Sequence, residues 1–84
     1  MSEMRVRVGD WGVFSALHPA PEIVRRVVNV WSDSQGIVYD ITTQKEWLAA
    51  QREDRDPVCV GFRARYLLRR ALASEVKAEL RDDN

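Results

Sequence analysis

The sequence predicts a mainly β domain that ends in a short α-helix. Two apolar runs, Val27–Trp31 and Ile37–Ile41, are rich in the β-branched and aromatic residues that favour strands. They flank Ser32–Gly36, whose serines, aspartate and glycine are typical of a turn, so together they predict a β-hairpin. Alternating apolar and polar residues continue outside this hairpin, whereas a helical repeat of apolar residues occurs only near the end of the chain.

The segment before the hairpin predicts two short extended elements and a loop. Apolar residues alternate with arginines over Met4–Val8, which predicts a strand with one exposed face. Gly9-Asp10 predicts a turn, and Trp11–Ser15 a second extended stretch. Ala16–Glu22 contains two prolines and is expected to form a loop, because a residue directly before proline disfavours the helical conformation.

The hairpin's second strand predicts a sheet with one buried face, because Ile37, Tyr39 and Ile41 alternate with more polar neighbours. After it, Thr43 and Glu46 have the spacing of a capping box, which predicts one or two helical turns within a polar connection.

Pro57–Phe62 then predicts a strand with Val58, Val60 and Phe62 on one face. Cys59 lies on its other face and is expected to act as a small buried apolar residue.

Two interpretations fit the C-terminal part. Apolar residues recur there at four-residue spacing, which is typical of a helix: Leu68, Leu72, Val76 and Leu80. Alternatively, Ala64–Leu67 forms a 3₁₀ turn and Leu68–Ala71 a strand, and only residues 74–82 are helical, with Ser74 as the N-cap. We favour the second interpretation, because the additional strand would cover a sheet edge.

Length and composition are those of one globular domain covering residues 1–84. Lys plus Arg and Asp plus Glu number thirteen each, so the chain has no net basic field to attract nucleic acid or anionic lipid. The start of the chain lacks the apolar core of a signal peptide, and no apolar run is long enough to span a bilayer. A cytoplasmic protein without membrane contact is therefore expected.

The order of the elements resembles that of SH3-like small β-barrels. The resemblance is carried by Val8-Gly9-Asp10, Val27–Trp31, Gly36–Ile41 and Val58–Leu68. It implies a five-stranded barrel followed by the C-terminal helix. Small barrels of this type serve many functions, so the resemblance alone assigns none.

The layout is also similar to that of the type II plasmid dihydrofolate reductases, small mobile-element cassette proteins and the barrel of nitrile hydratase β-subunits. In the reductases, a Val-Gln-Ile-Tyr motif on a late strand lines a tetrameric pore and binds ligand. The equivalent stretch here, Val60-Gly61-Phe62-Arg63, lacks the glutamine and the tyrosine. The resemblance therefore transfers no catalytic residue, and a small enzyme with a pore site at an oligomer axis is kept only as an alternative.

The sequence predicts no catalytic residue, metal site or cofactor. His18 and Cys59 are the only histidine and the only cysteine, which is too few for a structural zinc site. Nothing in the pattern predicts that they act as a nucleophile and its base. The leading hypothesis is a non-enzymatic binding module that acts through protein–protein contacts.

Tryptophan is enriched at interface hot spots, and this chain has three, Trp11, Trp31 and Trp47. In a small barrel their segments can converge at one end, where they would bind a basic or proline-rich peptide. The alternative is that they fill the ends of the barrel as part of the core. Val76 and Leu80 form a helical stripe that a small core cannot cover, so they predict self-association, with a homodimer as the first expectation.

A nucleic-acid-binding barrel is the competing hypothesis. It depends on a cluster of basic residues with no acid among them, Arg63, Arg65, Arg69 and Arg70. The plainer interpretation is a solvated face on which these arginines pair with Glu53, Asp54, Asp56 or the acidic tail, and the neutral net charge favours it.

Overall fold

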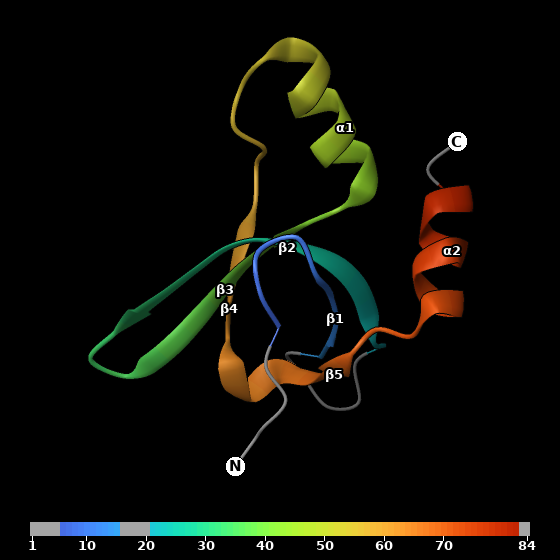
Figure 1. The fold of residues 1–84 in the computed structure, drawn as a ribbon. Helices are drawn as coiled ribbons and strands as arrows, with labels where there is room; N and C mark the ends of the chain where they lie inside the picture. Colours follow the sequence, from blue (N-terminus) through green and yellow to red (C-terminus); the bar gives the residue numbers. More distant parts are fainter. Residues whose placement is uncertain (1–5, 16–20, 83–84) are drawn as a thin grey trace.

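The computed structural model describes residues 6–15 and 21–82. It contains five strands, two α-helices and one 3₁₀ turn, which are β1 (Trp11–Phe14), β2 (Ile23–Asp33), β3 (Gly36–Thr42), α1 (Gln44–Glu53), β4 (Val60–Arg63), η1 (Ala64–Tyr66), β5 (Leu67–Arg70) and α2 (Ala73–Asp82). The strands form one antiparallel sheet in the order β4-β3-β2-β1-β5. Figure 1 shows the curved sheet, with α1 beyond one end of it and α2 beside it.

The predicted hairpin is confirmed, but its turn is shorter than expected. β2 and β3 stay paired until Asp33 faces Gly36, so only Ser34 and Gln35 form the turn. The Asp33 carboxylate accepts a hydrogen bond of 2.8 Å from the Gln35 main-chain N–H, which closes the turn locally. Gly36 has a φ of 120°, a conformation that glycine adopts without strain.

The predicted buried face is confirmed at the centre of the sheet. Tyr39 and Ile41 belong to the buried core together with Val6, Phe14 and Val27. Val38 is also buried, with 5% of its surface exposed, although it lies on the opposite face. The register explains this, because Trp31 and Arg63 are its direct partners on the two neighbouring strands.

The predicted strand over Met4–Val8 is wrong at its described residues, because residues 6–8 form no strand and Met4 lies outside the described residues. Arg7–Asp10 forms a turn instead, in which the Asp10 N–H donates to the Arg7 carbonyl and the Asp10 carboxylate accepts from the Arg7 N–H, both at 2.9 Å. β1 confirms the extended stretch that follows this turn. In the predicted loop over Ala16–Glu22, residues 16–20 lie outside the described residues.

Helix α1 has ten residues and is longer than the one or two turns expected. The Thr43 hydroxyl accepts from the Glu46 N–H at 3.0 Å, as the capping box predicts. The Glu46 side chain does not complete the box, because its carboxylate instead accepts from the Val58 N–H and from Arg55. The helix ends at Asp54, which has a left-handed φ of 54°.

The C-terminal part follows the second interpretation, with a 3₁₀ turn, a strand and a helix in succession. The helix begins at Ala73, so Ser74 is not its N-cap. The Glu75 carboxylate accepts from the Leu72 N–H at 2.8 Å, which satisfies an N-terminal donor in the way of a capping box. β5 pairs with β1, whereas no described pairing joins β4 to β5, so closure into an SH3-like barrel stays a prediction.

Candidate binding site

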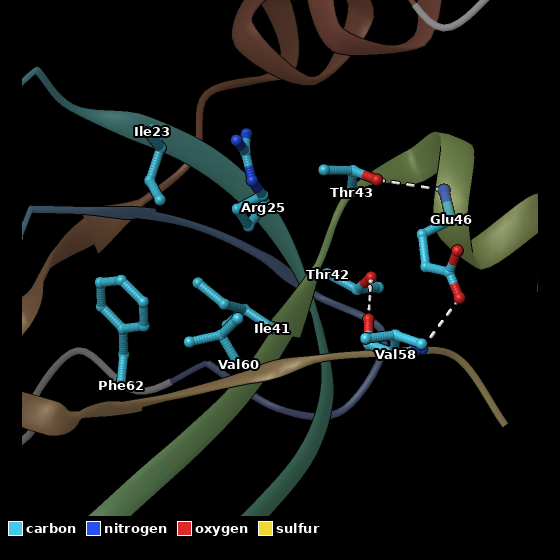
Figure 2. Close-up of a pocket in the computed structure, with 9 residues that line it drawn as sticks. All are labelled: Ile23, Arg25, Ile41, Thr42, Thr43, Glu46, Val58, Val60 and Phe62. Carbon is cyan, nitrogen blue, oxygen red and sulfur yellow. Dashed lines mark hydrogen bonds between the residues drawn. The ribbon is translucent and has the colours of Figure 1, made fainter.

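An apolar cavity of about 580 Å³ lies beside β4. Cavities of roughly 300–1,000 Å³ are typical of ligand-binding sites. Figure 2 shows the residues that line it, from β2, β3, the start of α1 and the β4 segment: Ile23, Arg25, Ile41, Thr42, Thr43, Glu46, Val58, Val60 and Phe62.

The floor of the cavity is continuous with the core. Ile41 is a buried core residue, and Ile23 and Phe62 pack against the same cluster. The Phe62 ring meets the Phe14 ring edge-on, with 5.6 Å between their centroids. Figure 2 shows four apolar side chains gathered on the side of the cavity away from Glu46: Ile23, Ile41, Val60 and Phe62.

The outer wall of the cavity is an exposed apolar strand segment. Residues two apart in a strand face the same side, so the sequence predicted one face for Val58, Val60 and Phe62. All three line the cavity. Val58 is 73% exposed and Val60 is 60% exposed. Both valines are therefore available to a partner.

Two side-chain contacts, one from α1 and one from β3, hold this segment in place. The Val58 N–H donates to the Glu46 carboxylate at 2.9 Å, and the Thr42 hydroxyl donates to the Val58 carbonyl at 2.8 Å. Arg55 also donates to Glu46 at 2.6 Å, and this hydrogen bond, with the one from Val58, holds the pKa of Glu46 below its usual value. Regular pairing begins only at Val60, so β4 is shorter than the predicted Pro57–Phe62 strand.

The rest of the rim is polar, and its one positive charge is balanced by one negative charge. The Arg25 guanidinium donates to the Val24 carbonyl at 2.9 Å and lies 3.9 Å from the Glu79 carboxylate of α2. The rim therefore carries one basic and one acidic side chain, Arg25 and Glu46, and both already have partners.

The structure brings Trp11 and Trp47 together around an arginine. The Arg26 guanidinium carbon lies 5.1 Å from the ring centroid of Trp11 and 4.0 Å from that of Trp47. The Gln44 side-chain oxygen accepts from the same guanidinium at 3.0 and 3.3 Å. Burial lowers the pKa of Arg26. These two tryptophans thus enclose a group of their own chain.

Trp31 is not part of this cluster. It pairs with Val38, four positions along β3 from the residue that Arg26 pairs with. That separation corresponds to roughly 13 Å along a strand. The indole N–H donates to the Asp40 carboxylate at 3.1 Å, and 43% of the residue is exposed. Among the predicted aromatic residues, Trp31 is the one exposed for contact with another molecule.

Arg63 and Arg69 are engaged in paired hydrogen bonds with acids. Arg63 donates to both Asp33 carboxylate oxygens at 2.7 and 2.8 Å, and Arg69 to both Glu75 oxygens at 2.8 and 2.6 Å. These hydrogen bonds are the largest cause of the lowered acid pKa values, which are about 2 for Asp33 and about 2 for Glu75. Asp33 lies thirty residues from Arg63 on β2, and Glu75 lies six residues from Arg69 on α2. Neither acid is among the predicted partners, which were Glu53, Asp54, Asp56 and the acidic tail.

The other two arginines of the predicted cluster also have contacts within the chain. The Arg65 guanidinium lies 5.0 Å from the ring centroid of Tyr66 and donates to its hydroxyl at 3.1 Å. Arg70 lies 3.7 Å from the Asp10 carboxylate.

The predicted helix stripe is only partly exposed. Leu80 is 40% exposed, whereas Val76 is half-buried. Leu72, just before the helix, is 60% exposed. The apolar surface near α2 is thus divided between contacts within the chain and the outside.

Cys59 is exposed at the β4 edge, which corrects its expected burial. Partial desolvation and the nearby carboxylates of Asp40 and Asp56 raise the pKa of its thiol, which is the opposite of what an activated nucleophile needs. His18 lies outside the described residues. Within the described ranges, no group of three or more His, Cys, Asp or Glu side chains is placed to hold a metal ion.

The cavity and the strand beside it offer apolar side chains next to a main-chain edge, a chemistry that suits an extended polypeptide. No helix in the described part of the chain is long and apolar enough to cross a membrane. The sequence matches no protein-family model and no curated protein, and the structure matches no solved structure.

Proposed function

We propose that this protein is a small, non-enzymatic binding module that acts through protein–protein contacts at the β4 edge. The observation that carries the proposal is the exposure of Val58 and Val60 on an edge strand that borders an apolar cavity. Soluble proteins usually protect such edges with charged residues, yet residues 57–62 contain no charge. A partner segment added as a further strand would cover the valines and place alternate side chains over the cavity.

An SH3-like small barrel is the scaffold that we propose for this site. The strand order supports it, since β1 pairs with both β2 and β5 and the sheet is strongly curved. The proposal excludes a catalytic role for the cavity. Glu46 is the carboxylate that lines it, and this group is held by Arg55 and by the Val58 N–H. A general acid or base would need to exchange its proton with a substrate.

The competing nucleic-acid function gains less support from the geometry. Arginine can bind phosphate through two parallel hydrogen bonds, and Arg63 and Arg69 belong to the predicted basic cluster. Both already make such contacts with acids. Binding of phosphate would have to displace these acids, whereas binding at the β4 edge displaces no described side-chain contact of Val60.

A displayed library of random decapeptides tests the proposal. The wild-type protein should enrich peptides with alternating apolar residues, and calorimetry with one enriched peptide should give a measurable affinity. Val60→Lys should weaken that affinity by about tenfold or more, equivalent to about 1.4 kcal/mol, because the charge would lie beside the apolar side chains of the added strand.

Val8→Lys is the matched control, because Val8 is 61% exposed and lies in the first turn rather than at the edge. It should bind the peptide as the wild type does. If no peptide is enriched, or if Val60→Lys binds as well as Val8→Lys, the β4 edge is not the binding site.

A further inference from the structure

We infer that the β4 edge binds a second copy of this chain, with the two β4 strands antiparallel across a two-fold axis and Val60 facing the partner's Val60. This inference rests on the proposed function, because it names the partner of the same site. It follows from the direction of the main-chain groups, from the register that the side chains permit and from the absence of charge over residues 57–62.

The hydrogen bonds of Val58 show which way the main-chain groups of this segment point. Its N–H and its C=O are both bound on the side of α1 and β3, by Glu46 and Thr42. Main-chain groups alternate in direction along an extended strand, so those of Val60, which pairs with Ile41, also face β3. The main-chain groups of Cys59 and Gly61 consequently point to the outer edge, where a second strand can bond to them.

The register centred on Val60 uses these groups and the apolar side chains together. Cys59 then faces the partner's Gly61, and the two such pairs exchange main-chain hydrogen bonds. The exposed Val58 faces the partner's Phe62, and Val60 faces its own copy. One apolar row therefore continues across the axis. Residues 57–62 carry no charge, so no like charges face each other between the two copies of this segment.

The two neighbouring registers fit less well. A ladder centred on Cys59 would place Gly61 opposite the partner's Pro57, which has no N–H to donate. A ladder centred on Gly61 would place Val58 opposite the partner's Ala64, which already belongs to the 3₁₀ turn η1. In that arrangement the most exposed valine of the segment would stay uncovered.

Disulfide trapping tests both the partner and the register. Val60→Cys combined with Cys59→Ser places a single thiol on the axis, in a non-hydrogen-bonded pair whose short Cα separation permits a disulfide. Copper-phenanthroline oxidation followed by a non-reducing gel should show a covalent dimer. The control is Val58→Cys with Cys59→Ser, whose two thiol-bearing residues would be roughly 13 Å apart along the strands.

The control tests for random collision between chains. Because Val58 is the more exposed of the two valines, random collision would crosslink Val58→Cys at least as fast as Val60→Cys. We expect Val60→Cys to form dimer at least about tenfold faster than Val58→Cys, since only the first pair lies within disulfide range. Equal rates would indicate collision and overturn the inference. Faster oxidation of the wild-type Cys59 than of Val60→Cys would move the axis and overturn the register.

Light scattering of the uncrosslinked protein distinguishes this inference from the proposed function. A concentration-dependent dimer should be present in the wild type and in Val8→Lys, and absent in Val60→Lys. A monomer at high micromolar concentration that still binds library peptides at β4 would overturn the self-pairing and leave the proposed function standing. A dimer that survives Val60→Lys but is lost with Val76→Ser and Leu80→Ser would assign self-association to α2.

Discussion

Arg26→Met should destabilise the protein by about 2–3 kcal/mol, although Arg26 lies outside the proposed binding site. The change keeps an apolar stem of similar length and removes the guanidinium between Trp11 and Trp47. Cation–π contacts contribute about 0.5–1 kcal/mol when exposed and about 2 kcal/mol when desolvated. The Gln44 oxygen, in a residue that is only 6% exposed, would also lose both donors at a cost of about 1–3 kcal/mol. Burial of the guanidinium, which lowers the pKa of Arg26, is itself unfavourable. Removing the charge therefore recovers part of the stability that these contacts contribute.

Urea denaturation followed by far-UV circular dichroism measures the effect without depending on tryptophan emission. Arg25→Met is the control on the same strand, and it should cost less than about 1 kcal/mol because its ion pair with Glu79 is partly exposed and spans 3.9 Å. A double-mutant cycle with Trp47→Leu should give a coupling energy of about 1 kcal/mol or more. Equal losses in Arg26→Met and Arg25→Met, or no coupling to Trp47, would refute the enclosed-arginine explanation.

Two further predictions concern the sheet and its ion pairs. Gly12→Ala should cost about 1–3 kcal/mol, because an added Cβ would lie 2.8 Å from the buried Phe14 ring. Gly61→Ala, whose nearest contacts would be at 3.2 Å, should cost less in the same urea assay, and equal costs would contradict the packing argument. Because the pKa values of Asp33 and Glu75 are lowered to about 2, their stabilisation is complete above the ordinary values of 3.8 and 4.5 and is lost as the pH falls toward 2. Thermal melts should therefore show a falling midpoint over that range, and a constant midpoint would exclude this contribution.

The elements that the sequence predicted well are held by contacts between residues that are close together in the sequence. The hairpin turn closes through Asp33 and Gln35, two residues apart, and the start of α1 through Thr43 and Glu46, three residues apart. Such contacts form from the local sequence and so leave a readable pattern. Where Glu46 failed to complete the capping box, the competing donor was Val58, twelve residues away.

The arrangement of the tryptophans could not be predicted, because it depends on register. Trp11 meets Arg26 as its direct partner between β1 and β2, and Trp47 reaches the same guanidinium from α1. No local signal indicates which residue faces which across two strands. The same reason explains the partner of Arg63, because this residue binds Asp33 thirty residues away across the sheet.

The sequence predicted which residues of the candidate site share a face, but it did not predict that two of them are exposed. Alternation placed Val58, Val60 and Phe62 on one face, and all three line one cavity. The strand pattern alone could not show that the two valines are exposed, because their exposure depends on the position of β4 at the edge of the sheet. Alternating apolar residues indicate a buried face by default. Because β4 is an edge strand, Val58 and Val60 are exposed although Phe62 on the same face packs against the core.

The energetics of the β4 edge favour a reversible contact over a permanent one. In the free protein, water already bonds to the outward main-chain groups, so each hydrogen bond formed with a partner adds only about 0.5–1.5 kcal/mol. Covering Val58 and Val60 adds roughly 25 cal/mol for each Å² of apolar surface removed from water. Association costs about 4–15 kcal/mol of translational and rotational freedom, so one short strand pair leaves little surplus. The assembly should therefore respond to the concentration of the chain, and a partner with more apolar surface should displace the second copy.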